Sequence, residues 1–134
     1  MSEISEIIDS LAIAMGAVLG ALARFYITEW SKSQFGTNFP YATFTINIIG
    51  CFAMGLVLPI AKNIAGYPVE LDLLIRTGFL GSFTTFSTYG FDTLTLWRSN
   101  RKFTAIFYWA GSAVGGLLAL LWGADLSQAL IHHN

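Results

Sequence analysis

The sequence predicts an all-α membrane protein with four transmembrane helices. Of its 134 residues, 54% are hydrophobic and only 11% are charged, and the mean hydropathy is +0.61. A soluble domain carries about a quarter charged residues, so this chain lacks the polar side chains needed to cover a water-facing surface. The length corresponds to one domain over residues 1–134.

Four stretches are long and apolar enough to cross a bilayer, because ~20 helical residues span its hydrocarbon core of ~30 Å. They cover residues 7–28, 41–61, 71–97 and 103–123. The connections are short and polar, so successive helices run antiparallel and both termini lie on one side. Pro40 suits the start of the second helix. Asn63, Gly66 and Pro68 punctuate the turn before the third.

The loop charges predict an orientation. Two basic residues, Lys62 and Arg76, lie on the side of the termini. Five lie on the other side: Arg24, Lys32, Arg98, Arg101 and Lys102. The excess favours termini that face outward, because positive loops stay inside. Counting Arg24 and Arg76 as structural leaves four against one.

Several function classes are excluded. A net charge of −1 without a basic run argues against a nucleic-acid partner. A single cysteine, Cys51, allows neither an internal disulfide nor a multi-cysteine zinc site. The only histidines, His132 and His133, are expected in a solvated tail. The sequence has no nucleotide-binding loop, HExxH motif or Ser–His pair, so we predict that the protein is not an enzyme.

The third stretch is unusually polar for a membrane helix. Six of the twelve residues from 77 to 88 are Ser or Thr, and two are Gly. Such residues weaken a helix, so we expect a break near the middle of the membrane, where loosened backbone can bind ions. The alternative is a tightly packed interface of small residues.

Polar residues also fall inside the second and fourth stretches. Thr43, Asn47 and Cys51 are four residues apart and share one helix face, as do Tyr108 and Ser112. Polar side chains that converge inside a membrane are candidate functional groups. Asn47 alone is also compatible with a single interhelical hydrogen bond, and Tyr108 with an interfacial aromatic belt.

Two further features suggest an anion. Phe86 and Tyr89 are three residues apart after the expected break, and an aromatic ring has a positive edge, although such pairs also serve packing. Arg24 fits an interfacial anchor, a helix C-terminal cap or an anion attractor at a vestibule. We expect no carboxylate deep in a span, with Asp92 near the break. A donor-rich, acid-poor lining suits a small anion.

These motifs resemble the Fluc (CrcB) fluoride channels. The resemblance rests on G-F-L-G-S-F-T-T-F-S-T at residues 78–88, on Thr43, Asn47 and Gly50, and on Gly16, Gly20 and Arg24. It implies a passive, fluoride-selective channel in the prokaryotic inner membrane that lowers fluoride toxicity. It also implies an antiparallel, dual-topology dimer, surrounded by lipid, with two pores. The charge bias leaves open whether the partner is identical or a paralogue of opposite orientation.

The resemblance assigns roles residue by residue. A structural sodium ion at the dimer centre is bound by the backbone carbonyls of Gly81 and Thr84 from each subunit. The pore phenylalanines correspond to Phe86 and to the position of Tyr89. The remaining pore positions are the following: Asn47, Thr43, Ser87, Tyr108 and Ser112.

The chain departs from the family pattern at three positions. Tyr89 replaces a phenylalanine and adds a hydroxyl that either binds or crowds fluoride. In the family, the fourth helix carries a row of polar side chains, and Gly116 lacks the hydroxyl expected at its position in that row. Ala42 replaces a glycine. We expect conductance to differ and the selected ion to be unchanged.

Two other functions compete with the channel. A proton-coupled multidrug exporter needs a buried carboxylate in its first span, where only Asp9 lies near the start. A non-transporting assembly subunit accounts for the glycine pairs Gly16/Gly20 and Gly111/Gly115. It does not account for Asn47 beside a Ser/Thr-rich break.

Overall fold

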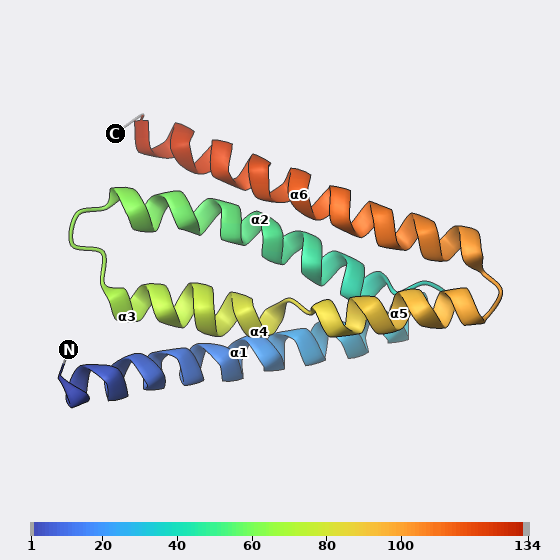
Figure 1. The fold of residues 1–134 in the computed structure, drawn as a ribbon, viewed down its shortest axis with the longest axis horizontal. Coiled ribbons are helices and arrows are strands. Elements are labelled where there is room, and N and C mark those ends of the chain that lie inside the picture. The colour runs from blue at the N-terminus through green and yellow to red at the C-terminus, as the bar shows by residue number, and fades with distance from the viewer. Residues whose placement is uncertain (1, 133–134) are drawn as a thin grey trace.

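The computed structural model describes residues 2–132, and every regular element among them is helical, so the all-α prediction is confirmed. The elements, shown in Figure 1, are α1 (Glu3–Phe35), α2 (Tyr41–Asn63), α3 (Val69–Asp72), the π-helix η1 (Leu73–Leu80), α4 (Gly81–Phe83), α5 (Phe86–Arg98) and α6 (Lys102–His132).

Three helices, α1, α2 and α6, are long and apolar enough to cross a membrane. α2 begins at the predicted residue, directly after Pro40. The other two helices continue beyond the predicted spans, since α1 covers residues 3–35 and α6 covers residues 102–132. The length of the apolar run determines how much of a helix lies inside lipid, whereas polar residues at its ends extend the same helix beyond the lipid. The Ser2 side chain caps α1, accepting a hydrogen bond from the Ser5 N–H, and Lys32 pairs with Glu29 in its last turn.

The third predicted stretch is divided into four short elements. α3, η1 and α4 follow one another directly from residue 69 to residue 83. Thr84 and Thr85 then have extended backbone, with ψ of 157° and 114°, before α5 begins at Phe86. Together these pieces form one interrupted rod (Figure 1), of which α3, η1 and α4 pack against α1, whereas α5 packs mainly against α6. That the rod crosses the bilayer as a fourth span stays a prediction.

Glycines set the distance between the packed helices. The largest contact is between α2 and α6, which run side by side in the same direction (Figure 1). A methyl group on Gly55 would lie 2.0 Å from the Leu120 carbonyl oxygen, and one on Gly123 would lie 2.3 Å from that of Phe52. In α1, a methyl on Gly16 would lie 2.0 Å from the Leu74 oxygen of η1. Only glycine allows backbones this close.

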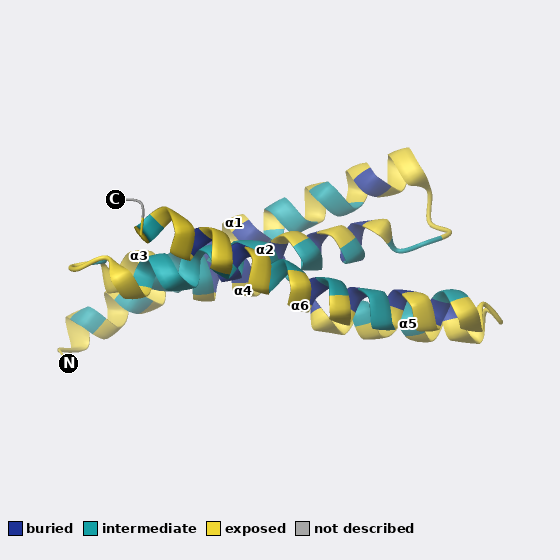
Figure 2. Cartoon of the chain, turned by 90° about the horizontal axis from the view of Figure 1, so that it is seen from above, coloured by how far each residue is buried: buried dark blue, intermediate teal, exposed yellow. Residues whose placement is uncertain are grey.

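The buried interior is thin. Ile46, Tyr108 and Ser127 are the largest side chains with less than 2% exposure among residues 2–132, and exposed residues cover most of the outer faces (Figure 2). Many large apolar side chains point outward, as expected for a surface that meets lipid.

The described parts of both termini lie at the same end of the molecule, as predicted (Figure 1). His132 is exposed in the last turn of α6, and His133 lies outside the described residues.

Candidate functional site

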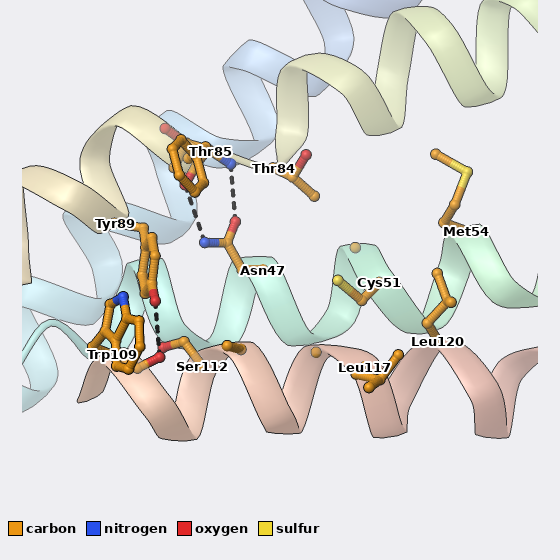
Figure 3. Close-up of a pocket in the computed structure, with 14 residues that line it drawn as sticks. Asn47, Cys51, Met54, Thr84, Thr85, Tyr89, Trp109, Ser112, Leu117 and Leu120 are labelled. Atoms are coloured by element: carbon orange, nitrogen blue, oxygen red, sulfur yellow. Dashed lines mark hydrogen bonds between the residues drawn. The ribbon is translucent and has the colours of Figure 1, made fainter. Parts of the chain in front are cut away.

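A half-open groove of about 630 Å³ runs along α2, α6 and the interruption between α4 and α5 (Figure 3). Five of the predicted site residues line it: Asn47, Thr84, Phe86, Tyr89 and Ser112. Cys51 and Gly116 line it as well, and most of the remaining wall is apolar. The groove therefore combines a few uncharged polar groups with apolar surroundings.

Asn47 holds the interruption in place. Its Oδ1 accepts a hydrogen bond of 2.9 Å from the Thr85 N–H, and its Nδ2 donates one of 3.1 Å to the Thr85 carbonyl oxygen (Figure 3). Thr85 is buried, so both backbone groups need a protein partner. Asn47 replaces the helical bonds lost at the break and keeps one N–H free of these two contacts.

The same interruption releases two backbone carbonyls. In a continuous helix the Thr85 N–H would bond to Gly81 and the Thr88 N–H to Thr84. Instead the Thr85 N–H bonds to Asn47, and the Thr88 N–H donates to Thr85 Oγ1 at 3.3 Å. The Gly81 and Thr84 carbonyls thereby lose their helical donors. These are the two carbonyls that the resemblance assigned to a sodium ion, and carbonyl oxygens suit a hard cation.

The two aromatic residues differ in their environment. Phe86 is 84% exposed although it lines the groove, and its ring centroid lies 5.7 Å from that of Tyr89. The Tyr89 hydroxyl donates a 2.8 Å hydrogen bond to the Trp109 carbonyl oxygen of α6. This hydroxyl, which sequence analysis left open between binding and crowding fluoride, ties α5 to α6.

Thr43 and Tyr108 lie outside the groove and meet at Asp92 in the second turn of α5. Thr43 Oγ1 donates to Asp92 Oδ2 at 2.8 Å, and the Tyr108 hydroxyl donates to the same oxygen at 3.4 Å. Tyr108 is fully buried and Asp92 is partly buried, so this carboxylate joins α2, α5 and α6. This role of Asp92 was not predicted from the sequence. The available signals were its position three residues after Tyr89 and its place near the expected break.

The other predicted site residues are also outside the groove. Ser87 is exposed, with its Oγ 3.4 Å from Thr85 Oγ1. Arg24 is half-buried on α1, and Gly81 is exposed at the start of α4. Within residues 2–132, no group of three or more His, Cys, Asp or Glu side chains is placed to bind a metal.

Replacing Asp92 with alanine should destabilise the protein by about 1–3 kcal/mol, because the buried Tyr108 hydroxyl loses its acceptor. Adding Tyr108→Phe and Thr43→Val to this variant should recover part of the loss, since the unpaired donors are then absent. Thermal unfolding in detergent measures both effects. Asp125→Ala, at an exposed position on α6, is the control and should change stability little. Equal melting of the Asp92 and Asp125 variants would contradict the assignment.

The comparisons with known proteins cover most of the chain. The family model described as CrcB-like protein, Camphor Resistance (CrcB), matches residues 11–124. The fluoride-specific ion channel FluC of Synechococcus sp. (strain JA-2-3B'a(2-13)) is 44% identical over 117 residues, which are 87% of this chain and 90% of that protein. The protein of the same name from Chloroflexus aurantiacus (strain ATCC 29366 / DSM 635 / J-10-fl) is 43% identical over 118 residues, or 88% and 94% of the two chains. The chain belongs to the CrcB family.

Proposed function

We propose that this chain is a subunit of a fluoride-selective ion channel. It is a multi-pass protein of a bacterial-type membrane and lets cytoplasmic fluoride leave passively, which lowers fluoride toxicity. The relatives named as fluoride-specific ion channels support this function. The observation that carries it in this chain is the groove of uncharged donors beside the interrupted helix. A channel of this kind catalyses no chemical reaction, in agreement with the sequence prediction.

The permeation path we propose follows the groove. The free N–H of Asn47, the Ser112 hydroxyl and the ring edge of Phe86 replace the water shell of fluoride at successive positions. The apolar wall between them carries no fixed charge that would trap the ion. Thr43 and Tyr108 act behind this path through Asp92, while Ser87 and Arg24 serve at its entrance. Closure of the groove by a second chain would narrow this path, and a narrow path lined by donors favours fluoride over the larger chloride.

The finer architecture is part of the same proposal. α3, η1, α4 and α5 together form a fourth span, broken at Thr84 and Thr85. Two chains pair in antiparallel orientation, and each of two pores lies between them. The open side of the groove and the exposed Phe86 at its rim support closure by a second chain. A purely packing subunit needs neither the donors nor the interruption.

A sodium ion fits the proposed dimer centre. Gly81 and Thr84 would hold it through their carbonyl oxygens, two from each chain. The ion would supply positive charge that fixes the two interrupted rods against each other. In support of this assignment, the N–H groups that would pair with these carbonyls in a helix bond to the side chains of Asn47 and Thr85 instead. The two carbonyls therefore need another partner.

Passive export needs no coupling machinery. Hydrogen fluoride crosses membranes as a neutral acid and ionises in a less acidic cytoplasm. An inside-negative potential then drives the anion out with about 2.3 kcal/mol per 100 mV. The protein has only to provide a path, which agrees with the absence of a nucleotide-binding motif from the sequence.

Replacing Phe86 with isoleucine should abolish fluoride efflux from liposomes that contain the purified chain, because the ring edge is lost from the path. A fluoride electrode measures the efflux, and size-exclusion chromatography checks that the protein stays assembled. Phe103→Ile is the matched control, since Phe103 is also 84% exposed but lies outside the groove. Chloride efflux equal to fluoride efflux would contradict selectivity. If liposomes that contain only the wild-type chain show no fluoride efflux, the proposal that this chain conducts fluoride without a second kind of subunit is contradicted.

Labelling of both termini from each side of sealed vesicles tests the dimer. An identical antiparallel partner exposes each terminus on both sides. A paralogous partner of opposite orientation leaves each terminus of this chain on one side.

A further inference from the structure

Within the groove, the thiol of Cys51 on α2 faces Gly116 on α6, which has no side chain. Cys51 lies one helical turn after Asn47 on α2, and Gly116 lies one turn after Ser112 on α6. All four residues line the groove (Figure 3). A methyl group built on Gly116 would lie 3.2 Å from Cys51 Sγ, so the sulfur occupies the space in front of this glycine.

The neighbouring level holds an unused donor. The Ser112 side chain is only 8% exposed, and its Oγ has no hydrogen-bond partner within the described chain. A buried hydroxyl without a partner costs free energy, so such a group in a groove points to a ligand that completes it. The Ser112 hydroxyl and the Cys51 thiol lie one level apart on facing helices.

We infer that the Cys51 thiol is a fluoride-binding donor of the permeation path, at the level where Gly116 on the facing helix supplies no side chain. The inference rests on the proposed function. A thiol carries one S–H donor, which is weaker than a hydroxyl, on an atom larger than oxygen. The larger atom explains the glycine opposite, because any side chain at position 116 would press against the sulfur.

Moving the donor between helices tests this inference. Cys51→Ala removes the donor and should lower fluoride efflux about fivefold, the ratio expected for one net hydrogen bond. Cys51→Ser keeps a donor and should retain most of the flux. The double variant Cys51→Ala/Gly116→Ser places the donor on α6 instead and should recover flux relative to Cys51→Ala. Cys51→Ala/Gly116→Ala is the matched control, because its methyl group refills the space without adding a donor, and equal recovery by this variant would overturn the inference. Size-exclusion chromatography accompanies each measurement.

Covalent labelling provides an independent readout. Methyl methanethiosulfonate is small and neutral, and the Cys51 thiolate attacks its sulfenyl sulfur. A new S–S bond forms, the bond to the sulfonyl sulfur breaks, methanesulfinate leaves with the electron pair, and the thiol proton passes to solvent. The added methylthio group should block efflux through the wild type. Cys51→Ser has no thiol, since the chain contains one cysteine, and should keep its own rate after the same treatment.

Each outcome decides a different question. Complete labelling by intact mass together with blocked efflux supports the inference. Complete labelling with unchanged efflux, or a thiol that is not labelled in the folded protein, overturns it. Equal efflux from Cys51→Ala and wild type also overturns it. If the unlabelled wild type conducts no fluoride, the proposed function of this chain fails, and the role of Cys51 fails with it.

Discussion

Asn47→Ala should abolish fluoride efflux and lower the stability of the protein by about 2–4 kcal/mol. The alanine leaves both the N–H and the carbonyl oxygen of Thr85 without their partners, at a residue that is only 7% exposed. It also removes the free amide donor from the groove. Without these bonds the interruption loses its fixed geometry, because the backbone groups of Thr85 have no helical bonds to replace them. Liposome efflux and thermal unfolding in detergent measure the two effects.

Asn63→Ala is the matched control for this substitution. Asn63 is on the same helix, but its exposed amide donates only to the Pro59 carbonyl oxygen, at 2.8 Å. Its removal should change stability by no more than about 0.5 kcal/mol and leave efflux intact. Identical melting and efflux of the two alanine variants would show that the Asn47 contacts do not hold the interruption.

Gly55→Ala should destabilise the protein by about 1–3 kcal/mol, because the added methyl overpacks the contact between α2 and α6. This methyl would lie 2.0 Å from the Leu120 carbonyl oxygen, so the two helices must move apart. Gly123→Ala, with its methyl 2.3 Å from the Phe52 oxygen, should act in the same direction. Efflux should also fall, since both helices line the groove.

Gly111→Ala provides the control on α6. There the nearest atom to the added methyl is Phe44 Cε2 at 3.9 Å, which is ordinary contact. Alanine is the better helix former by about 1 kcal/mol, so this variant should melt at the same temperature as wild type or higher. Three glycine variants with equal melting temperatures would contradict the close backbone approach.

The sequence by itself determined the class of the protein and the positions of its long helices. Apolar runs of fixed length predict spans because the bilayer core has a fixed thickness, and α2 begins at the predicted Tyr41. Helix spacing also predicted that Asn47 and Cys51 share a face, and both line the groove. The Ser/Thr-rich segment indicated where regular helix ends, because these side chains compete with backbone bonds.

Only the tertiary structure decided which polar groups meet. Thr43 shares a helix face with Asn47, yet Thr43 donates to Asp92, whereas Asn47 binds the backbone of Thr85. Periodicity assigns a residue to a face of its own helix, but the crossing of neighbouring helices decides what that face meets. The same reason explains Gly116, whose missing side chain becomes meaningful only beside the sulfur of Cys51 from another helix. Hydrogen bonds and van der Waals contacts act over a few ångströms, so residues distant in sequence become partners only once the helices are packed.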